Sequence, residues 1–230
     1  MGPLRASVSS LSVAAVTALL LILLASGQAS AHMPIIEKKD TAGFADAIHI
    51  RDPAVSWAIY GFLEKPGDAD YYYFDLEDGL NVYTELLVPV SPVYEEFRPS
   101  YAIVGPGVPG NDAVPFETAP GSSALVVDSP GGARETFYEP FGGITYYKGI
   151  PKHTMLTVPG RYYVVVYDDR LMRGDYVLAV GEKESFRLRD LPGVIAAVFR
   201  IRTGAVDHSS IVSGNSETCP ANNSPSGPVI

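Results

Sequence analysis

Cysteine is almost absent from this chain of 230 residues, which contains only Cys219. A single cysteine excludes an intramolecular disulfide and a metal site built from several thiolates. Basic side chains are also outnumbered, since 17 Lys and Arg stand against 26 Asp and Glu. The resulting net charge of −9 argues against nucleic acid and anionic membranes as partners. Stability must therefore come from a hydrophobic core, to which a bound metal ion could add.

Sequence templates for catalysis are missing as well. The chain contains no GxSxG, HExxH, phosphate-binding loop or Rossmann glycine pattern. Cys219 lies in a Ser-, Asn- and Pro-rich segment, which is typical of an incidental thiol rather than a nucleophile. Glu139 lies among Pro and Gly residues that indicate a shaped loop. We therefore expect a protein that is not an enzyme, and an enzyme of unknown type is the third alternative after a binding module and a metal-binding protein.

Long apolar runs occur only near the N-terminus. Residues 1–31 combine a basic residue, Arg5, the apolar run VAAVTALLLILLA and the small residues Ala29-Ser30-Ala31. This order is typical of a secretory signal peptide, and the run is shorter than the ~20 residues that a bilayer span needs. We expect cleavage after Ala31, no membrane span afterwards, and a secreted, periplasmic or cell-surface location. Cleavage removes one positive charge, that of Arg5, so the net charge changes from −9 to −10.

The rest of the chain contains many short segments rich in aromatic and β-branched residues, separated by Gly and Pro. This pattern predicts an all-β fold, an antiparallel β-sandwich of the jelly-roll type. We assign the sandwich to residues 56–189, after an N-terminal extension at residues 32–55.

Side-chain alternation predicts which face of each strand is buried. In the segment that starts at Asp70, the residues Tyr72, Phe74 and Leu76 share its face, which we assign to the core. The pair Asp78-Gly79 then predicts a hairpin to the strand LNVYTELLVP. The segment RYYVVVYD is apolar on both faces, which predicts a central strand, with DYVLAVG as the partner that follows it.

Two motifs resemble a known family. GDADYYYFDLEDG, followed by NVYTELLVP, and later VPGRYYVVVYDDRLMRGDYVLAV look like the opening and closing strand pairs of bacterial pre-peptidase C-terminal (PPC) domains. The resemblance covers about residues 56–181 and implies a jelly-roll β-sandwich. The segments FRPSYAIVGPGVPG and FYEPFGG depart from the family pattern. The layout also resembles that of uncharacterised exported proteins, for which the resemblance implies no particular activity.

The C-terminal part differs from the sandwich. Residues 190–203 predict a short amphipathic helix with Asp190 as its N-cap and an apolar stripe that docks on the sandwich. Residues 204–230 are rich in Ser, Asn, Pro and Gly, and this composition predicts a disordered tail.

Carboxylates at turns and strand ends suggest a calcium site, because Ca²⁺ prefers oxygen ligands. The candidate ligands are Asp68, Asp70, Asp168, Asp169 and Asp175. The alternative is that these residues only form turns and cap strands through their side chains.

Histidines suggest a second, copper-binding alternative. Cleavage after Ala31 would leave His32 at the mature N-terminus, where its amine and imidazole nitrogens could chelate Cu²⁺. His49 or His153 would supply a third nitrogen, and His208 is a poorer choice. The sequence therefore favours a secreted, non-catalytic β-sandwich that binds an unknown ligand, surface or protein partner. The competing hypothesis is a protein that binds Cu²⁺ or Ca²⁺.

Overall fold

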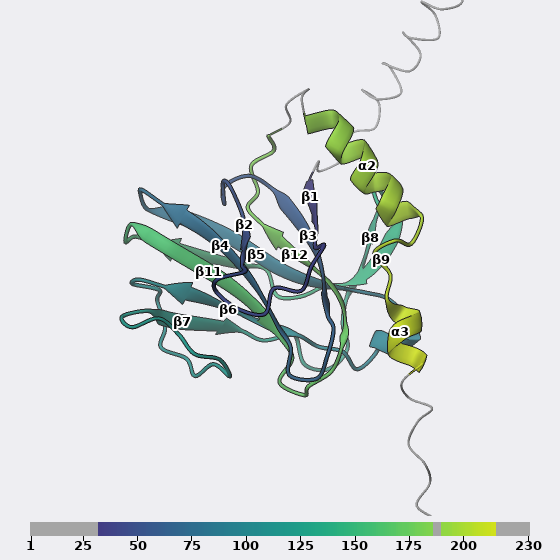
Figure 1. The fold of residues 1–230 in the computed structure, drawn as a ribbon, viewed down its shortest axis with the longest axis horizontal. Helices are drawn as coiled ribbons and strands as arrows, with labels where there is room; N and C mark the ends of the chain where they lie inside the picture. The colour runs from purple at the N-terminus through teal and green to yellow at the C-terminus, as the bar shows by residue number, and fades with distance from the viewer. Residues whose placement is uncertain (1–31, 186–189, 215–230) are drawn as a thin grey trace, which may run out of the picture. The chain divides into compact units, whose positions relative to one another are not determined.

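The computed structural model describes residues 32–185 and 190–214 (Figure 1). These residues form twelve β-strands in two sheets, together with short helices. Within these two ranges, no helix is long and apolar enough to cross a membrane. The expected signal peptide, the residues beyond 214 and Cys219 lie outside the described residues.

The larger sheet has seven strands in the order β1-β3-β12-β5-β9-β8, and β10 also pairs with β5. Its strands are β1 (Met33–Ile36), β3 (Trp57–Leu63), β5 (Leu80–Pro89), β8 (Thr136–Glu139), β9 (Ile144–Tyr147), β10 (Lys152–Leu156) and β12 (Gly174–Val180). The smaller sheet has five strands in the order β2-β4-β11-β6-β7. Its strands are β2 (Ile48–His49), β4 (Ala69–Leu76), β6 (Ser100–Gly105), β7 (Ser123–Val127) and β11 (Gly160–Tyr167).

The all-β sandwich predicted from the sequence is confirmed, with one departure from a purely antiparallel arrangement. The two N-terminal strands pair in parallel, β1 with β3 and β2 with β4, while the other ladders are antiparallel. Both N-terminal strands lie at sheet edges. The chain that precedes the sandwich proper therefore contributes one strand to each sheet.

The core lies between the sheets, where alternate side chains of each strand meet. Tyr72 and Phe74 of β4 are fully buried, as the alternation predicts, and Phe74 stacks on Tyr162 of β11 with ring centroids 5.8 Å apart. The opposite face of β4 is less open than expected. Tyr71 is also buried, because the ring of Phe44 packs on it with centroids 4.9 Å apart.

The predicted hairpins are wrong, although the strands are correct. β4 pairs with β2 and β11, whereas β5 pairs with β12, β10 and β9, so Asp78-Gly79 carries the chain from one sheet to the other. β11 and β12 are likewise in different sheets. Crossing between sheets allows both strands of each consecutive pair to direct their apolar faces into one core.

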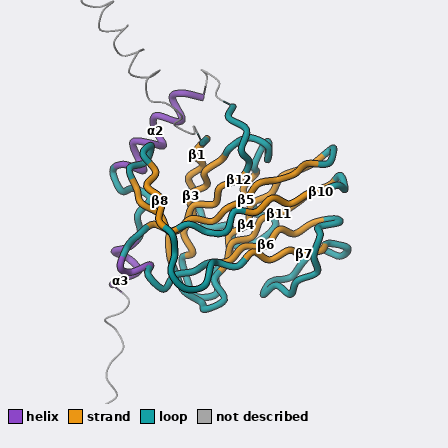
Figure 2. Tube along the Cα trace, turned by 180° about the vertical axis from the view of Figure 1, so that it is seen from behind, coloured by secondary structure: helices purple, strands orange, loops and turns teal. Residues whose placement is uncertain are grey.

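Two helices follow the sandwich, α2 (Leu191–Arg202) and α3 (Ser209–Gly214). Both views place α2 beside β1 and β8 and away from β7 (Figures 1 and 2). Of its apolar side chains Ile201 is buried, whereas Leu191, Ile195 and Phe199 are exposed, so one residue near its C-terminal end anchors the helix. Asp190 does not cap α2 with its side chain, because its backbone is already helical. The segment expected to be disordered from residue 204 contains α3 in its described part.

Candidate metal and ligand sites

A cluster of three carboxylates lies where the N-terminal segment meets the start of β4. Asp40 follows β1, and Asp68 and Asp70 stand at the first residues of the GDADYYYF motif. One carboxylate oxygen from each of the three lies within 4.8 Å of the others. Asp68 and Asp70 are buried and Asp40 is half-buried. Hereafter these three residues are called the acidic cluster.

Local structure explains the position of each carboxylate. Asp68 Oδ2 accepts a hydrogen bond of 2.6 Å from the backbone N–H of Glu64, which fixes the turn before β4. Asp70 has the same strand parity as Tyr72 and Phe74, so alternation directs it inward. Its Oδ2 accepts a hydrogen bond from the Tyr176 hydroxyl, and the hydroxyl oxygens of Tyr176 and Tyr72 lie 2.7 Å apart.

The acidic cluster is only partly neutralised by the protein. Lys65 Nζ lies 3.0 Å from Asp40 Oδ2 and 3.0 Å from Asp68 Oδ1, and these hydrogen bonds raise the pKa of Lys65. Asp40 Oδ1 and Asp70 Oδ1 are buried without a hydrogen-bond partner among the described residues. Two oxygens that point into the protein are thus left unsatisfied, which is unusual for buried carboxylates.

Burial also changes the protonation of this region. Desolvation raises the pKa of Asp70 to about 9, and the nearby Glu37 adds to the increase. Desolvation likewise raises the pKa of Glu37 to about 7. In the native protein without a bound cation, burial therefore favours the protonated form of Asp70. A hard divalent cation could replace that proton, because carboxylate oxygens are the ligands that Ca²⁺ prefers.

The other aspartates predicted as calcium ligands lie elsewhere. Asp168 Oδ1 accepts hydrogen bonds from the backbone N–H groups of Arg170 and Met172, so it shapes the turn after β11. Asp169 is exposed beside it. Asp175 lies on β12 and binds other partners, described below. Among the predicted five, only Asp68 and Asp70 come together in the acidic cluster.

The three histidines proposed for copper have separate surroundings. His32 Nδ1 lies 2.5 Å from the hydroxyl oxygen of Ser56, and burial lowers the pKa of its ring. His49 stacks on Tyr73 with centroids 4.7 Å apart. His153 Nδ1 lies 3.8 Å from a carboxylate oxygen of Glu182. Each of these histidines has a different neighbour, and a copper site built from the His32 amine and ring with His49 or His153 stays a prediction.

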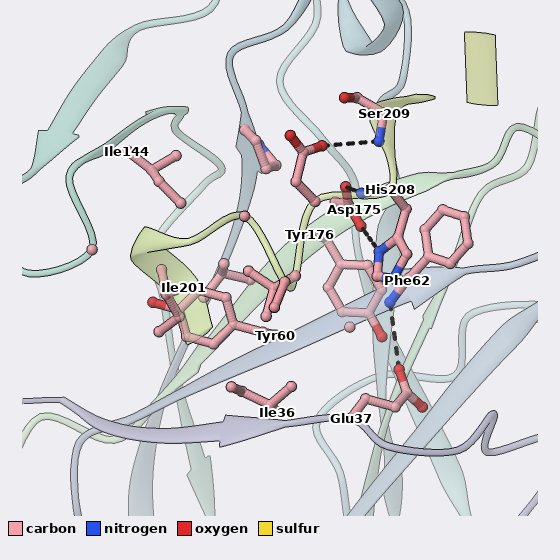
Figure 3. A pocket seen from close by; sticks show the side chains of 18 of the residues that line it. Ile36, Glu37, Tyr60, Phe62, Ile144, Asp175, Tyr176, Ile201, His208 and Ser209 are labelled. Atoms are coloured by element: carbon pink, nitrogen blue, oxygen red, sulfur yellow. Dashed lines mark hydrogen bonds and ion pairs between the residues drawn. The ribbon is translucent and has the colours of Figure 1, made fainter. Parts of the chain in front are cut away.

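A cavity of about 760 Å³ lies between the outer face of the larger sheet and the C-terminal segment (Figure 3). One part of its wall is apolar, with Ile36, Tyr60, Ile144 and Ile201. The other part is polar, and Glu37, Asp175 and His208 line it. Its volume is within the range of ~300–1,000 Å³ typical of small-molecule sites.

Asp175 clamps the C-terminal segment onto this cavity. Its Oδ1 lies 2.6 Å from His208 Nδ1, and its Oδ2 accepts a hydrogen bond of 2.8 Å from the His208 backbone N–H. The Tyr94 hydroxyl donates a further hydrogen bond of 2.6 Å to the same Oδ2. The His208 ring stacks on Phe62 with centroids 4.3 Å apart. Hereafter the two hydrogen bonds between Asp175 and His208 are called the Asp175–His208 clamp.

The two sheets define the molecule as an all-β sandwich protein. No family model matches the chain, and no curated protein is significantly similar to it. One similar solved structure is the pre-peptidase C-terminal domain of a collagenase from Bacillus anthracis. The two chains are 17% identical, with 63% of this chain and 98% of that chain covered and a TM-score of 0.31. The fold assignment rests on the strand pairing described above rather than on this similarity.

Proposed function

We propose that the protein is an exported, non-catalytic binding module whose sandwich is stabilised by Ca²⁺ at the acidic cluster. The features of residues 1–31 support export, since they follow the order of a secretory signal peptide. The absence of sequence templates for catalysis supports a binding role. With a single cysteine, the chain has no internal disulfide to stabilise it outside the cell, and a bound ion would supply such stabilisation instead.

The observation that carries the calcium proposal is the unpartnered Oδ1 of Asp70, a residue with 0% exposure. An ionised carboxylate buried without a partner is costly, and its charge must be removed by a proton or matched by a cation. Lys65 forms its ion pairs with Asp40 and Asp68. A metal ion between the three carboxylates would instead be coordinated by Asp70 directly.

Binding at this point would also join separate parts of the chain. Asp40 belongs to the N-terminal extension, whereas Asp68 and Asp70 belong to the sandwich. Thr41, next to Asp40, already accepts a hydrogen bond of 2.9 Å at its Oγ1 from the Tyr71 backbone N–H. An ion held by all three carboxylates would strengthen this attachment, and unfolding would then require its release.

The test is thermal unfolding of the chain from residue 32 in EDTA, in saturating Ca²⁺ and in Mg²⁺. A ligand at ~100 times its Kd stabilises the native state by ~2.7 kcal/mol, which corresponds to a rise in Tm of about 5–10 °C at this chain length. We expect such a rise with Ca²⁺ and a smaller one with Mg²⁺, which demands a more rigid octahedral site.

Variants at two positions of β4 make the test specific. Asp70→Asn should abolish the response to Ca²⁺, because it removes the buried ligand. Asp75→Asn is the matched control, since Asp75 is exposed on the same strand and pairs with Arg161 at 2.8 Å. A Tm unchanged by Ca²⁺, or raised equally in the wild type and Asp70→Asn, would show that Lys65 and a proton satisfy the acidic cluster without metal.

A further inference from the structure

The cavity beneath the Asp175–His208 clamp has an uneven distribution of charge. Glu37 is half-buried in its wall, whereas the basic residues that line it, among them Lys38, Lys39 and Arg200, are exposed. Long basic side chains keep their charged ends in water, so their positive charge lies at the rim. The interior is therefore more negative than the rim.

Glu37 is a half-buried carboxylate in this wall whose hydrogen bonds are long. Its Oε1 accepts a bond of 3.2 Å from the Thr41 hydroxyl, and its Oε2 accepts one of 3.4 Å from the Phe62 backbone N–H. Both are long for hydrogen bonds to a carboxylate. Glu37 forms no ion pair with any cation in the described part of the chain. Asp175, by contrast, is held by His208 and Tyr94.

A second polar group in the cavity wall is the hydroxyl of Tyr146. The residue is 2% exposed, and burial raises the pKa of its hydroxyl, with the neighbouring Tyr60 adding to the increase. Tyr146 lines the cavity next to the apolar part formed by Ile144 and Ile201.

We propose that this cavity is a binding site for a small organic cation, with an apolar body and one protonated amine. The amine would lie against Glu37, and the apolar body would pack on Ile36, Tyr60 and Ile201. An anionic ligand is disfavoured, because it would approach Glu37 and the acidic cluster beyond it. Burial raises the pKa of Glu37 to about 7, in keeping with a carboxylate that has no cation beside it. This site gives the proposed binding module a ligand class, but it does not depend on calcium.

Three probes that differ only in their head groups test the charge preference. We would titrate 4-phenylbutylamine, 4-phenylbutanol and 4-phenylbutyrate into the chain from residue 32, in EDTA and at about pH 8, where Glu37 is mostly ionised. Binding would be followed by calorimetry and by protein NMR. We expect the amine to bind at least tenfold more tightly than the alcohol and the carboxylate to bind most weakly. Equal affinities of the three probes, or no binding of the amine, would overturn the proposal.

Two variants test whether Glu37 causes the preference for the amine. Glu37→Gln keeps the shape of the side chain and should reduce amine affinity to that of the alcohol, with the alcohol unaffected. Glu64→Gln is the control, because Glu64 also lines the cavity but is exposed. An unchanged preference for the amine in a folded Glu37→Gln protein would place the cation elsewhere and overturn the assignment. The probe series on the wild type remains decisive if that variant does not fold, and the Ca²⁺ response is measured separately, so either proposal can fail alone.

Discussion

Replacing Asp70 with Asn should make the stability of the metal-free protein less sensitive to pH. Burial raises the pKa of Asp70 from 3.8 to about 9, so between these values the native state holds a proton that the unfolded state has released. The contribution of this group is therefore fully present below the unfolded pKa, and it is lost as pH rises through the folded pKa. The free energy of unfolding should fall with pH by at most ~1.4 kcal/mol per unit for this one group.

The titration of Glu37 also lowers the free energy of unfolding as pH rises, but over a narrower pH range. Its pKa rises from 4.5 to about 7, so it contributes a second decrease in stability that ends near neutral pH. Asp70→Asn leaves this smaller dependence in place and removes the larger one. Between about pH 5 and about pH 8, the wild type should lose up to ~4 kcal/mol more than the variant.

Urea unfolding in EDTA at several pH values measures this difference directly, with Asp75→Asn as the control. Arg161 lowers the pKa of Asp75 through its hydrogen bond, so the charge of Asp75 is constant in both states across this window, and the control should follow the wild type. Saturating Ca²⁺ should flatten the wild-type profile, because the ion replaces the proton on Asp70. Parallel profiles of the wild type and Asp70→Asn in EDTA would show that Asp70 is ionised without metal, and would refute the reasoning.

Two further predictions concern the core and the C-terminal segment. Phe74→Ala should lower the free energy of unfolding, measured in urea, by ~3–5 kcal/mol, because Phe74 is fully buried. Tyr73→Ala should lower it by less than half of that, because Tyr73 is half-buried. Similar losses for the two variants would contradict the alternation of β4. His208→Ala should lower the free energy of unfolding by ~1–3 kcal/mol, because Asp175 loses its imidazole partner. Ending the chain at Thr203 should lower it at least as much, and an unchanged melting temperature for that shorter chain would show that the Asp175–His208 clamp adds no stability.

Alternation in the sequence predicted the strands and the buried face of β4, because it depends only on neighbouring residues. The same rule placed Asp70 on the face of Phe74, so its burial could be inferred before the structure. The pairing of the strands could not be predicted from alternation. Asp78-Gly79 suits a hairpin and a crossing between sheets equally well, and the choice depends on which distant strands compete for the same edge.

The sites were less accessible to sequence reasoning, because each combines distant segments. Asp40 joins the acidic cluster through the parallel pairing of β1 with β3, and no local pattern marks it as a ligand. His208 lies in a segment whose average composition indicates disorder. The buried carboxylate of Asp175 and the ring of Phe62 hold that residue in place, and neither contact can be inferred from the composition of the segment.

The parallel placement of β1 and β2 has a consequence for self-association. An open sheet edge offers unpaired backbone groups to other chains and promotes aggregation, and short or proline-containing edge strands limit this. β1 has four residues, one of them Pro34, and β2 has two. They cover the longer strands β3 and β4, one in each sheet. Proteolytic loss of residues 32–50 would uncover both edges together, so we expect the shortened chain to aggregate more readily than the intact one.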